Sequence, residues 1–303
     1  MKKIVVEKSK TVTFPVVIGE EVDLEGIIGG KESFFVTDAD GNLEECLNDL
    51  SENIVYVLSL TKENFAKFLE EIGDKKDVKW ILAPKRPMEM VYNGGVPYFT
   101  YPEAVYLDMD VISNLSNDDF YELIAYAMRL GMEQSTNLYG YIINHLYELC
   151  DLDYETMEEL FEMIYKVHER IMVRKTKDER NHLSLPEVMG EFYDSLGLYK
   201  HSDAIAYGCI NGAYYSYRNE FISTEDYYEI RDMFVPFGLS IMQTKRNKAE
   251  LLDAFHKFLK EKNYEKEIRS MKKIGKLDQC VDFDKWLDEA LFEAVFFDEE
   301  SND

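Results

Sequence analysis

A histidine at the start of a helix rich in small residues is the first group in this chain that could do chemistry. His201 begins the stretch HSDAIAYGCINGA, in which Ala204, Gly208 and Gly212 recur at every fourth position. Residues with this spacing share one face of a helix, so the stripe lets another backbone approach closely. Asp203 complements the positive end of the helix. His201 precedes that end, where an imidazole can face a cavity.

A cluster of basic residues is the second candidate, and it stands out against an acidic background. A phosphate or carboxylate clamp would use such residues, because arginine makes two-pronged contacts with these anions. The alternative is a solvated helix end whose cations complement the negative end of the dipole. Asp178 and Glu179 partly neutralise the cluster, so both interpretations stay open. The cluster consists of Arg170, Arg174, Lys175, Lys177 and Arg180.

Two carboxylates have both a functional and a structural interpretation. Asp38 follows a strand-like run, where an acidic side chain could hold ribose hydroxyls. The segment 38–41 (DADG) is at least as typical of an Asx turn. Glu187 ends the pattern Ser184-Leu185-Pro186-Glu187, which predicts a capping box with proline in the first helical turn. We favour the cap over a ligand role for Glu187.

The elements that must position these residues fall into two parts, with a boundary expected near residue 113. In residues 1–112, short apolar runs alternate with amphipathic stretches such as 62–72, which carries Phe65, Phe68, Leu69 and Ile72 on one face. This alternation predicts a Rossmann-like α/β domain with a largely parallel sheet. In residues 113–303 the periodicity is helical almost throughout, which predicts an all-α domain.

Composition and charge exclude several classes of function. The 303 residues include 34 Lys and Arg against 59 Asp and Glu, and the formal net charge is -25. Nucleic acid and anionic membranes are therefore not expected as partners. We see no apolar stretch of signal-peptide or membrane-spanning length. The four cysteines lack CxxC spacing, so we expect reduced thiols in a cytoplasmic protein.

Five blocks in chain order resemble the 3-dehydroquinate synthase family: 14–19, 35–38, 101–110, 201–213 and 223–239. The strongest match, 201–213, is similar to the family pattern H-G-E-A-V-A-x-G-M, whose histidine is a zinc ligand. The resemblance implies an NAD-binding α/β domain joined to a helical metal-binding domain, and a homodimer. It also implies a lyase of the shikimate pathway, which forms 3-dehydroquinate from a phosphorylated seven-carbon sugar acid. In that family NAD carries a hydride and zinc or cobalt acts as a Lewis acid.

The chain departs from the family pattern at the cofactor and metal positions. The glycine loop that cradles the NAD pyrophosphate in the family corresponds to residues 84–87 (PKRP), and proline has no amide hydrogen to offer. The family's glutamate ligand aligns with Tyr126, and a nearby lysine aligns with Arg129. The family's G-H-x-x-G-H aligns with 186–191, where glutamates replace both histidines. His201 is thus the one ligand that is kept, with Glu187 as an oxygen substitute, whereas catalytic zinc normally has three protein ligands.

We therefore expect a shortened homologue that has lost the parent reaction, a pseudoenzyme that keeps the dehydroquinate synthase-like fold and a cleft for a small anionic ligand. No cofactor is assigned. One alternative is an active 3-dehydroquinate synthase or related sugar-phosphate cyclase with a rebuilt site, which would use NAD and zinc or cobalt. The other is a non-catalytic structural or regulatory protein. The site residues under these hypotheses are Arg129 and Arg180 for catalysis, Asp38 for the cofactor, His201 and Glu187 for the metal, and Arg174, Lys175 and Lys177 for the anion.

Overall fold

The structure is a computed structural model that describes residues 2–9, 12–19, 26, 28–72, 77–84, 102–174, 183–242, 247–264, 268–282 and 289–295. The chain divides into two compact units. Unit 1 comprises Met1–Asp119 and Asp151–Lys175, and unit 2 comprises Phe120–Cys150 and Thr176–Asp303. The division is not a single cut of the chain, because helix α9 (Tyr154–Arg174) returns to unit 1.

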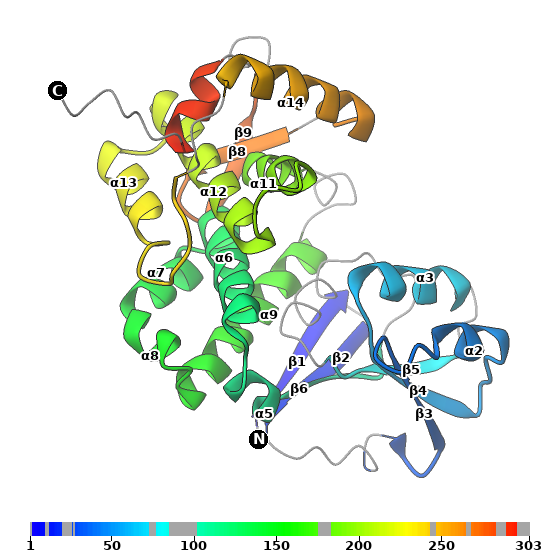
Figure 1. The fold of residues 1–303 in the computed structure, drawn as a ribbon. Coiled ribbons are helices and arrows are strands. Elements are labelled where there is room, and N and C mark those ends of the chain that lie inside the picture. Colours follow the sequence, from blue (N-terminus) through cyan, green and yellow to red (C-terminus); the bar gives the residue numbers. More distant parts are fainter. Residues whose placement is uncertain are drawn as a thin grey trace. The chain divides into compact units, whose positions relative to one another are not determined.

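A six-stranded sheet forms the centre of unit 1, with the order β1-β2-β6-β5-β4-β3 (Figure 1). Strands β1 and β2 are antiparallel, and every other neighbouring pair is parallel. The prediction of a largely parallel α/β sheet is confirmed. The strands are β1 (Lys2–Ser9), β2 (Val12–Gly19), β3 (Glu32–Thr37), β4 (Ile54–Ser59), β5 (Lys79–Leu82) and β6 (Ala104–Asp108).

Helix α3 (Lys62–Ile72) packs on the sheet through the apolar face that its periodicity predicted. Phe65 and Phe68 are completely buried, and their ring centroids lie 5.5 and 6.3 Å from that of Trp80 on β5. Burial of such large side chains is the main source of stability for a layer of this kind. The other helices of unit 1 are α2 (Leu43–Asn48), α5 (Met109–Ser113) and α9, which packs against β1.

Helices dominate unit 2, but a three-stranded sheet of order β7-β8-β9 accompanies them. The helical periodicity did not predict this sheet, because its strands are short and β7 pairs with a distant part of the chain. The strands are β7 (Leu183–Ser184), β8 (Ile268–Lys273) and β9 (Lys276–Cys280). The helices, of which α6 begins in unit 1, are α6 (Asn117–Gln134), α7 (Thr136–Asn144), α8 (Leu146–Cys150), α11 (Leu185–Ser195), α12 (His201–Arg218), α13 (Thr224–Asp232), α14 (Lys248–Lys262) and the 3-10 helix η1 (Glu289–Val295).

The stripe of small residues on α12 lies where α11 comes closest. A Cβ atom on Gly208 would lie 2.3 Å from the carbonyl oxygen of Pro186 and 2.8 Å from the Cα of Gly190. A Cβ atom on Gly212 would lie 2.5 Å from the Pro186 ring. The predicted close approach of another backbone is therefore confirmed, and that backbone is the first half of α11.

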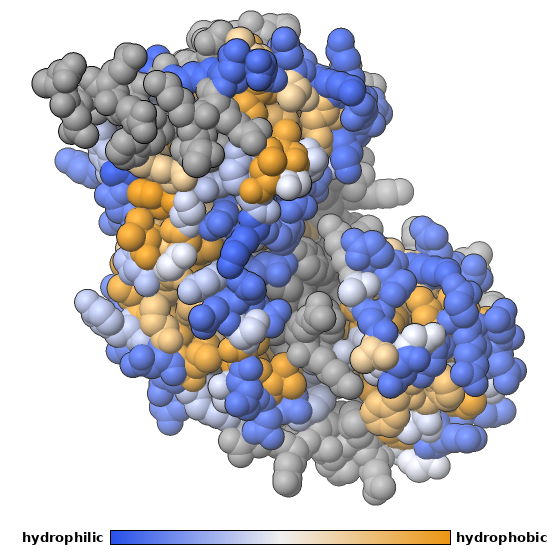
Figure 2. All heavy atoms as spheres, viewed as in Figure 1, coloured by the Kyte–Doolittle hydropathy of each residue, from blue (hydrophilic) through white to orange (hydrophobic). Residues whose placement is uncertain are grey.

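The surface of unit 1 is hydrophilic over its helices (Figure 2). Hydrophilic side chains cover most of the visible face of α2 and α3 (Figure 2). Within the described ranges, no helix combines the length and the apolar character needed to cross a bilayer.

Candidate functional site

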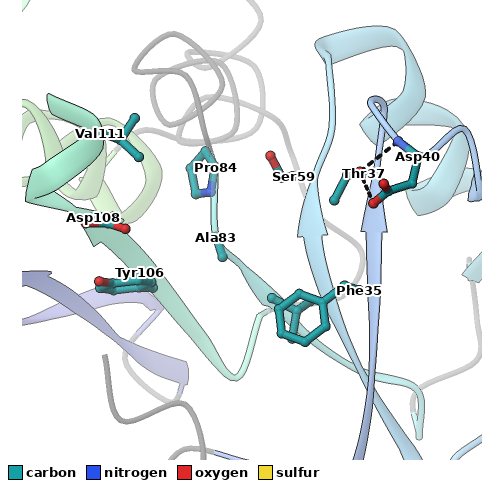
Figure 3. Close-up of a pocket in the computed structure, with 10 residues that line it drawn as sticks. Phe35, Thr37, Asp40, Ser59, Ala83, Pro84, Tyr106, Asp108 and Val111 are labelled. Carbon is teal, nitrogen blue, oxygen red and sulfur yellow. Dashed lines mark hydrogen bonds between the residues drawn. The ribbon is translucent and has the colours of Figure 1, made fainter. Parts of the chain in front are cut away.

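A cavity of about 380 Å³ opens at the carboxyl ends of the parallel strands in unit 1 (Figure 3). Ligands of open parallel sheets bind at this edge. Thr37, Ser59 and Asp108 are the last residues of β3, β4 and β6, and Pro84 follows β5. The sheet therefore brings to one place side chains that are far apart in the sequence. The cavity is lined by Phe35, Thr37, Asp40, Val57, Ser59, Ala83, Pro84, Tyr106, Asp108 and Val111.

Local hydrogen bonds orient the two carboxylates of this cavity. The Thr37 hydroxyl donates to Oδ2 of Asp40 at 2.6 Å and accepts from the Asp40 N–H at 3.0 Å. Oδ1 of Asp108 accepts from the N–H of Asp110 at 2.9 Å, at the start of α5. Among the described residues that line the cavity none is basic. Carboxylates and hydroxyls in this arrangement suit a ligand that donates hydrogen bonds, such as a polyol.

Asp38, the predicted ribose ligand, makes its contacts at the start of α3. Its Oδ2 accepts from the N–H of Thr61, and its Oδ1 accepts from the side-chain amide of Asn64 at 2.6 Å. Asp40, rather than Asp38, is among the described lining residues. The turn after β3 is closed by Thr37 and Asp40. Binding of a cofactor by Asp38 stays a prediction.

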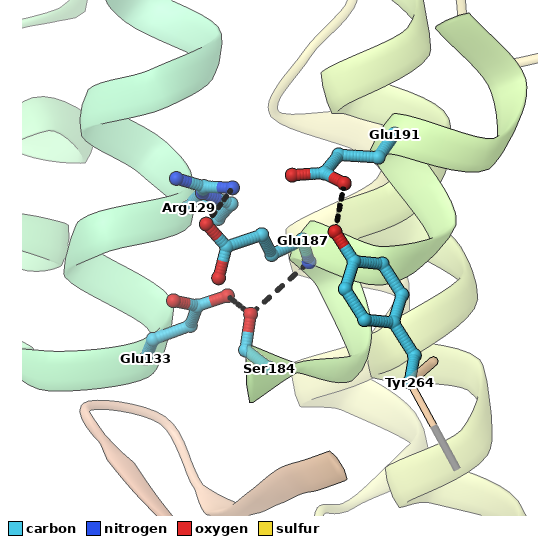
Figure 4. A network of polar contacts seen from close by, with 6 residues as sticks. All are labelled: Arg129, Glu133, Ser184, Glu187, Glu191 and Tyr264. Carbon is cyan, nitrogen blue, oxygen red and sulfur yellow. Dashed lines mark hydrogen bonds and ion pairs between the residues drawn. The ribbon is translucent and has the colours of Figure 1, made fainter. Parts of the chain in front are cut away.

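A network of charged side chains connects α6 with α11 inside unit 2 (Figure 4). Nη1 of Arg129 lies 3.7 Å from Oε1 of Glu187, and the guanidinium carbon lies 5.1 Å from the ring centroid of Tyr126. The Ser184 hydroxyl donates to the carboxylate of Glu133 and accepts from the N–H of Glu187 at 3.0 Å. Ser184 thus caps α11 as predicted, but the predicted capping box is only half formed, because the Glu187 side chain faces Arg129.

The network is largely buried, which strengthens its electrostatics. Burial by itself lowers the pKa of Arg129, but Glu187 and Glu133 more than offset that effect, and the net pKa lies above its ordinary value. Burial raises the pKa of the Tyr126 phenol, and the neighbouring Arg129 opposes the change in part. Arg129 therefore stays charged and Tyr126 stays neutral over the physiological range.

Glu191, the second glutamate of this segment, has its own partner. The Tyr264 hydroxyl donates to Oε2 of Glu191 at 2.6 Å. Burial raises the pKa of Tyr264, and the hydrogen bond to Glu191 raises it further. The phenol therefore remains a donor to this carboxylate.

His201 begins α12 and lies between two carboxylates of unit 2. Its Nδ1 lies 3.1 Å from Oδ1 of Asp194, and its Nε2 lies 3.5 Å from Oε1 of Glu122. Asp203 accepts from the N–H of Ser240 at 3.0 Å, so it fixes a loop as well as favouring the helix end.

These residues do not fit the zinc or cobalt that the resemblance implies. Glu187 faces a guanidinium, and both ring nitrogens of His201 face carboxylates. Across the part of the chain that the structure describes, no three His, Cys, Asp or Glu side chains are grouped to hold a metal ion. Metal binding by His201 and Glu187 therefore stays a prediction that the observed donor set does not favour.

Within the described ranges, the basic cluster is represented by Arg170, which lies on α9 and is partly exposed. Arg174 ends α9, but its side chain lies outside the described residues, as do Lys175, Lys177 and Arg180. Their roles as an anion clamp and a catalytic arginine stay predictions. Arg129, the other predicted catalytic residue, is placed in the buried network.

Sequence reasoning missed two kinds of residue. Glu133 was detectable, because it lies four positions after Arg129 on one helix, a spacing at which opposite charges meet. Asp40 lies in the predicted turn 38–41, beside the predicted ligand Asp38. Tyr264 and Asp108 had no such signal, because Tyr264 bonds to a distant segment and Asp108 reaches the cavity only through the sheet.

Comparisons with known proteins agree with this architecture. No family model matches the chain. It is 21% identical over 159 residues to 3-dehydroquinate synthase from Dictyoglomus turgidum, covering 49% of this chain and 43% of the relative. A second 3-dehydroquinate synthase, from Thermoanaerobacter pseudethanolicus, is 21% identical over 161 residues, covering 52% of this chain and 45% of the relative. The matched part thus spans less than half the length of each curated relative.

Solved structures match over almost the whole chain. A 2-deoxy-scyllo-inosose synthase complexed with carbaglucose-6-phosphate, NAD+ and Co2+ has a TM-score of 0.73 at 11% identity, covering 96% of this chain and 98% of that chain. A 2-epi-5-epi-valiolone synthase from Streptomyces hygroscopicus subsp. jinggangensis 5008, with NAD+ and Zn2+ bound, has a TM-score of 0.64 at 10% identity, covering 94% and 96%. The resemblance seen in the motifs is therefore confirmed as similarity: part of the chain resembles 3-dehydroquinate synthases in sequence, and the chain shares its fold with the two solved synthases.

Proposed function

We propose that this chain is a 3-dehydroquinate synthase homologue in which an ion-pair network takes the place of the metal centre, so that the metal-assisted reaction is lost. One observation carries the proposal. Tyr126 and Glu187, two of the three positions that the resemblance matches with metal ligands, both contact the guanidinium of Arg129. Arginine stays protonated in a protein, and unlike a metal ion it cannot coordinate an oxygen atom of a substrate. It therefore supplies positive charge without the Lewis acidity that zinc or cobalt provides.

The remaining ligand site in this proposal is the cavity of unit 1. Its carboxylates and hydroxyls suit the hydroxyl groups of a small polar ligand, and the family resemblance favours the ribose part of a dinucleotide. The NAD pyrophosphate would require cations or free amides. Residues 85–101, which follow Pro84, lie outside the described residues. The anionic ligand held by Arg174, Lys175 and Lys177 remains a separate part of the proposal.

A turnover assay tests the loss of the reaction. The purified protein is incubated with the phosphorylated seven-carbon substrate, NAD and Zn2+ or Co2+, and phosphate release is measured. The Dictyoglomus turgidum synthase serves as the positive control. We expect phosphate release at the rate of a protein-free sample, and no stoichiometric zinc or cobalt by metal analysis. Phosphate release that depends on both NAD and metal overturns the proposal.

The second candidate is an active sugar-phosphate cyclase with a rebuilt site. The observation that favours it is the structural match over 96% of the chain to a cyclase whose structure holds NAD+ and Co2+. Calorimetric titration with NAD distinguishes the two, because hydride chemistry requires a bound nicotinamide. Micromolar NAD binding together with turnover of a sugar phosphate would favour the cyclase.

A further inference from the structure

We infer that Arg129 is the built-in counter-ion of Glu133 and Glu187, and that removing its guanidinium would turn this cluster into a binding site for a divalent cation. The inference rests on the proposed function, in which an ion pair occupies the place of a metal. It goes further in two respects. It states that Glu133 and Glu187 are the groups that need a positive charge, and that a divalent cation would supply this charge if the Arg129 guanidinium were removed.

The two carboxylates require a positive charge because of where they lie. Glu133 is 6% exposed, and the side chain of Glu187 is about one-third exposed. In Figure 4, both carboxylates and the guanidinium point toward the space between α6 and the start of α11. A buried carboxylate without a compensating charge strongly destabilises a fold. The Arg129 guanidinium is paired with Glu187, and Glu133 also acts on its charge.

The contact depends on charge more than on hydrogen-bond geometry. The Nη1–Oε1 separation of 3.7 Å is longer than a hydrogen bond, so the usual two-pronged pairing of arginine with a carboxylate is not made. Nε of Arg129 is buried and has no hydrogen-bond partner within the described part of the chain. If Arg129 were there to make directional hydrogen bonds, its buried Nε–H would have an acceptor. The positive charge is what Glu133 and Glu187 require.

A divalent cation is the natural substitute once the guanidinium is gone. Glu133 and Glu187 would supply carboxylate oxygens, and the Ser184 hydroxyl donates to the Glu133 carboxylate and accepts from the backbone N–H of Glu187. Oxygen donors of this type suit Mn2+ and Mg2+. Truncation to alanine also vacates the volume of a long side chain, which leaves room for the ion and its water ligands.

The test uses the full-length protein and Mn2+ as the probe. Arg129→Ala is compared with the wild type and with Arg129→Lys, which keeps the charge. Calorimetry and thermal unfolding are measured with and without Mn2+. We expect Arg129→Ala to have a lower melting temperature that rises with Mn2+ concentration, and to bind one Mn2+ at least tenfold more tightly than the wild type. The lysine variant should show neither effect.

A triple variant shows which groups bind the ion. Arg129→Ala combined with Glu133→Gln and Glu187→Gln removes both anions, so it should unfold at a higher temperature than Arg129→Ala and show no response to Mn2+. If Arg129→Ala does not fold in the absence of metal, its refolding yield with Mn2+ gives the same answer. Recovery by Mn2+ supports the inference, and no recovery overturns it.

The outcomes separate this inference from the proposed function. An Arg129→Ala protein that ignores Mn2+, or a wild type that binds Mn2+ equally well at these carboxylates, overturns the counter-ion role. Turnover by the wild-type protein overturns the proposed function in an assay that uses none of these variants.

Discussion

Replacing Gly208 by alanine tests whether the close approach of α11 and α12 organises unit 2. The added Cβ would lie 2.3 Å from the carbonyl oxygen of Pro186, 2.5 Å from the amide nitrogen of Gly190 and 2.8 Å from its Cα. All three atoms belong to the backbone of α11. No flexible side chain can move aside, so the two helices themselves must separate.

The magnitude follows from these distances. Ordinary van der Waals contact begins at 3.4 Å, so the helices must move apart by about 1 Å to relieve the shortest contact. Overpacking of a core costs about 1–3 kcal/mol, and separation of two backbones places this case at the upper end. Alanine gains about 1 kcal/mol over glycine from helix propensity. We expect the free energy of unfolding of unit 2 to fall by about 2 kcal/mol.

The assay is urea unfolding followed by circular dichroism, with Gly140→Ala as the matched control. A Cβ on Gly140, in the middle of α7, meets nothing within 4 Å. That variant should be neutral or more stable than the wild type by up to about 1 kcal/mol. If Gly208→Ala has the same free energy of unfolding as Gly140→Ala, the conclusion that the backbones of α11 and α12 are in close contact is refuted.

Three further predictions concern burial and hydrogen bonding. Burial raises the pKa of Cys46 to about 12, so its thiol should react slowly in the folded protein. A thiol reagent at pH 8 should modify the exposed Cys150 and Cys280 in the native protein, and the buried Cys46 and Cys209 only after unfolding. Immediate reaction of all four cysteines would contradict this burial. Hydrogen bonds from Thr156 lower the pKa of Asp153 below its ordinary 3.8, so this carboxylate stabilises the start of α9 above about pH 5 and loses the effect as the pH falls through the lowered pKa. The stability difference between the wild type and Asp153→Asn should therefore vanish in acid, and a pH-independent difference would refute the assignment. Ser184→Ala removes the donor to Glu133 and the cap of α11, and should cost about 1–3 kcal/mol by urea unfolding, whereas a neutral effect would show that neither contact matters.

Local periodicity predicted those features that depend on spacing within one segment. The buried face of α3 and the small-residue stripe of α12 follow from which residues share a helix face. The parallel sheet follows from the alternation of short apolar runs with helices. The small sheet of unit 2 escaped prediction, because β7 has two residues and pairs with β8 across a long stretch of chain.

The candidate site was predictable in its residue types and unpredictable in its pairings. The residue types come from the sequence, and the resemblance predicts that glutamates and a tyrosine stand where the family has metal ligands and that one histidine is kept. Tertiary structure decided that Arg129 on α6 meets Glu187 on α11, and that Asp38 holds the start of α3 while Asp40 lines the cavity. The physical reason is that a charged side chain on one element pairs with whichever partner the packing brings within a few ångströms from another element, and spacing along the chain does not encode that distance.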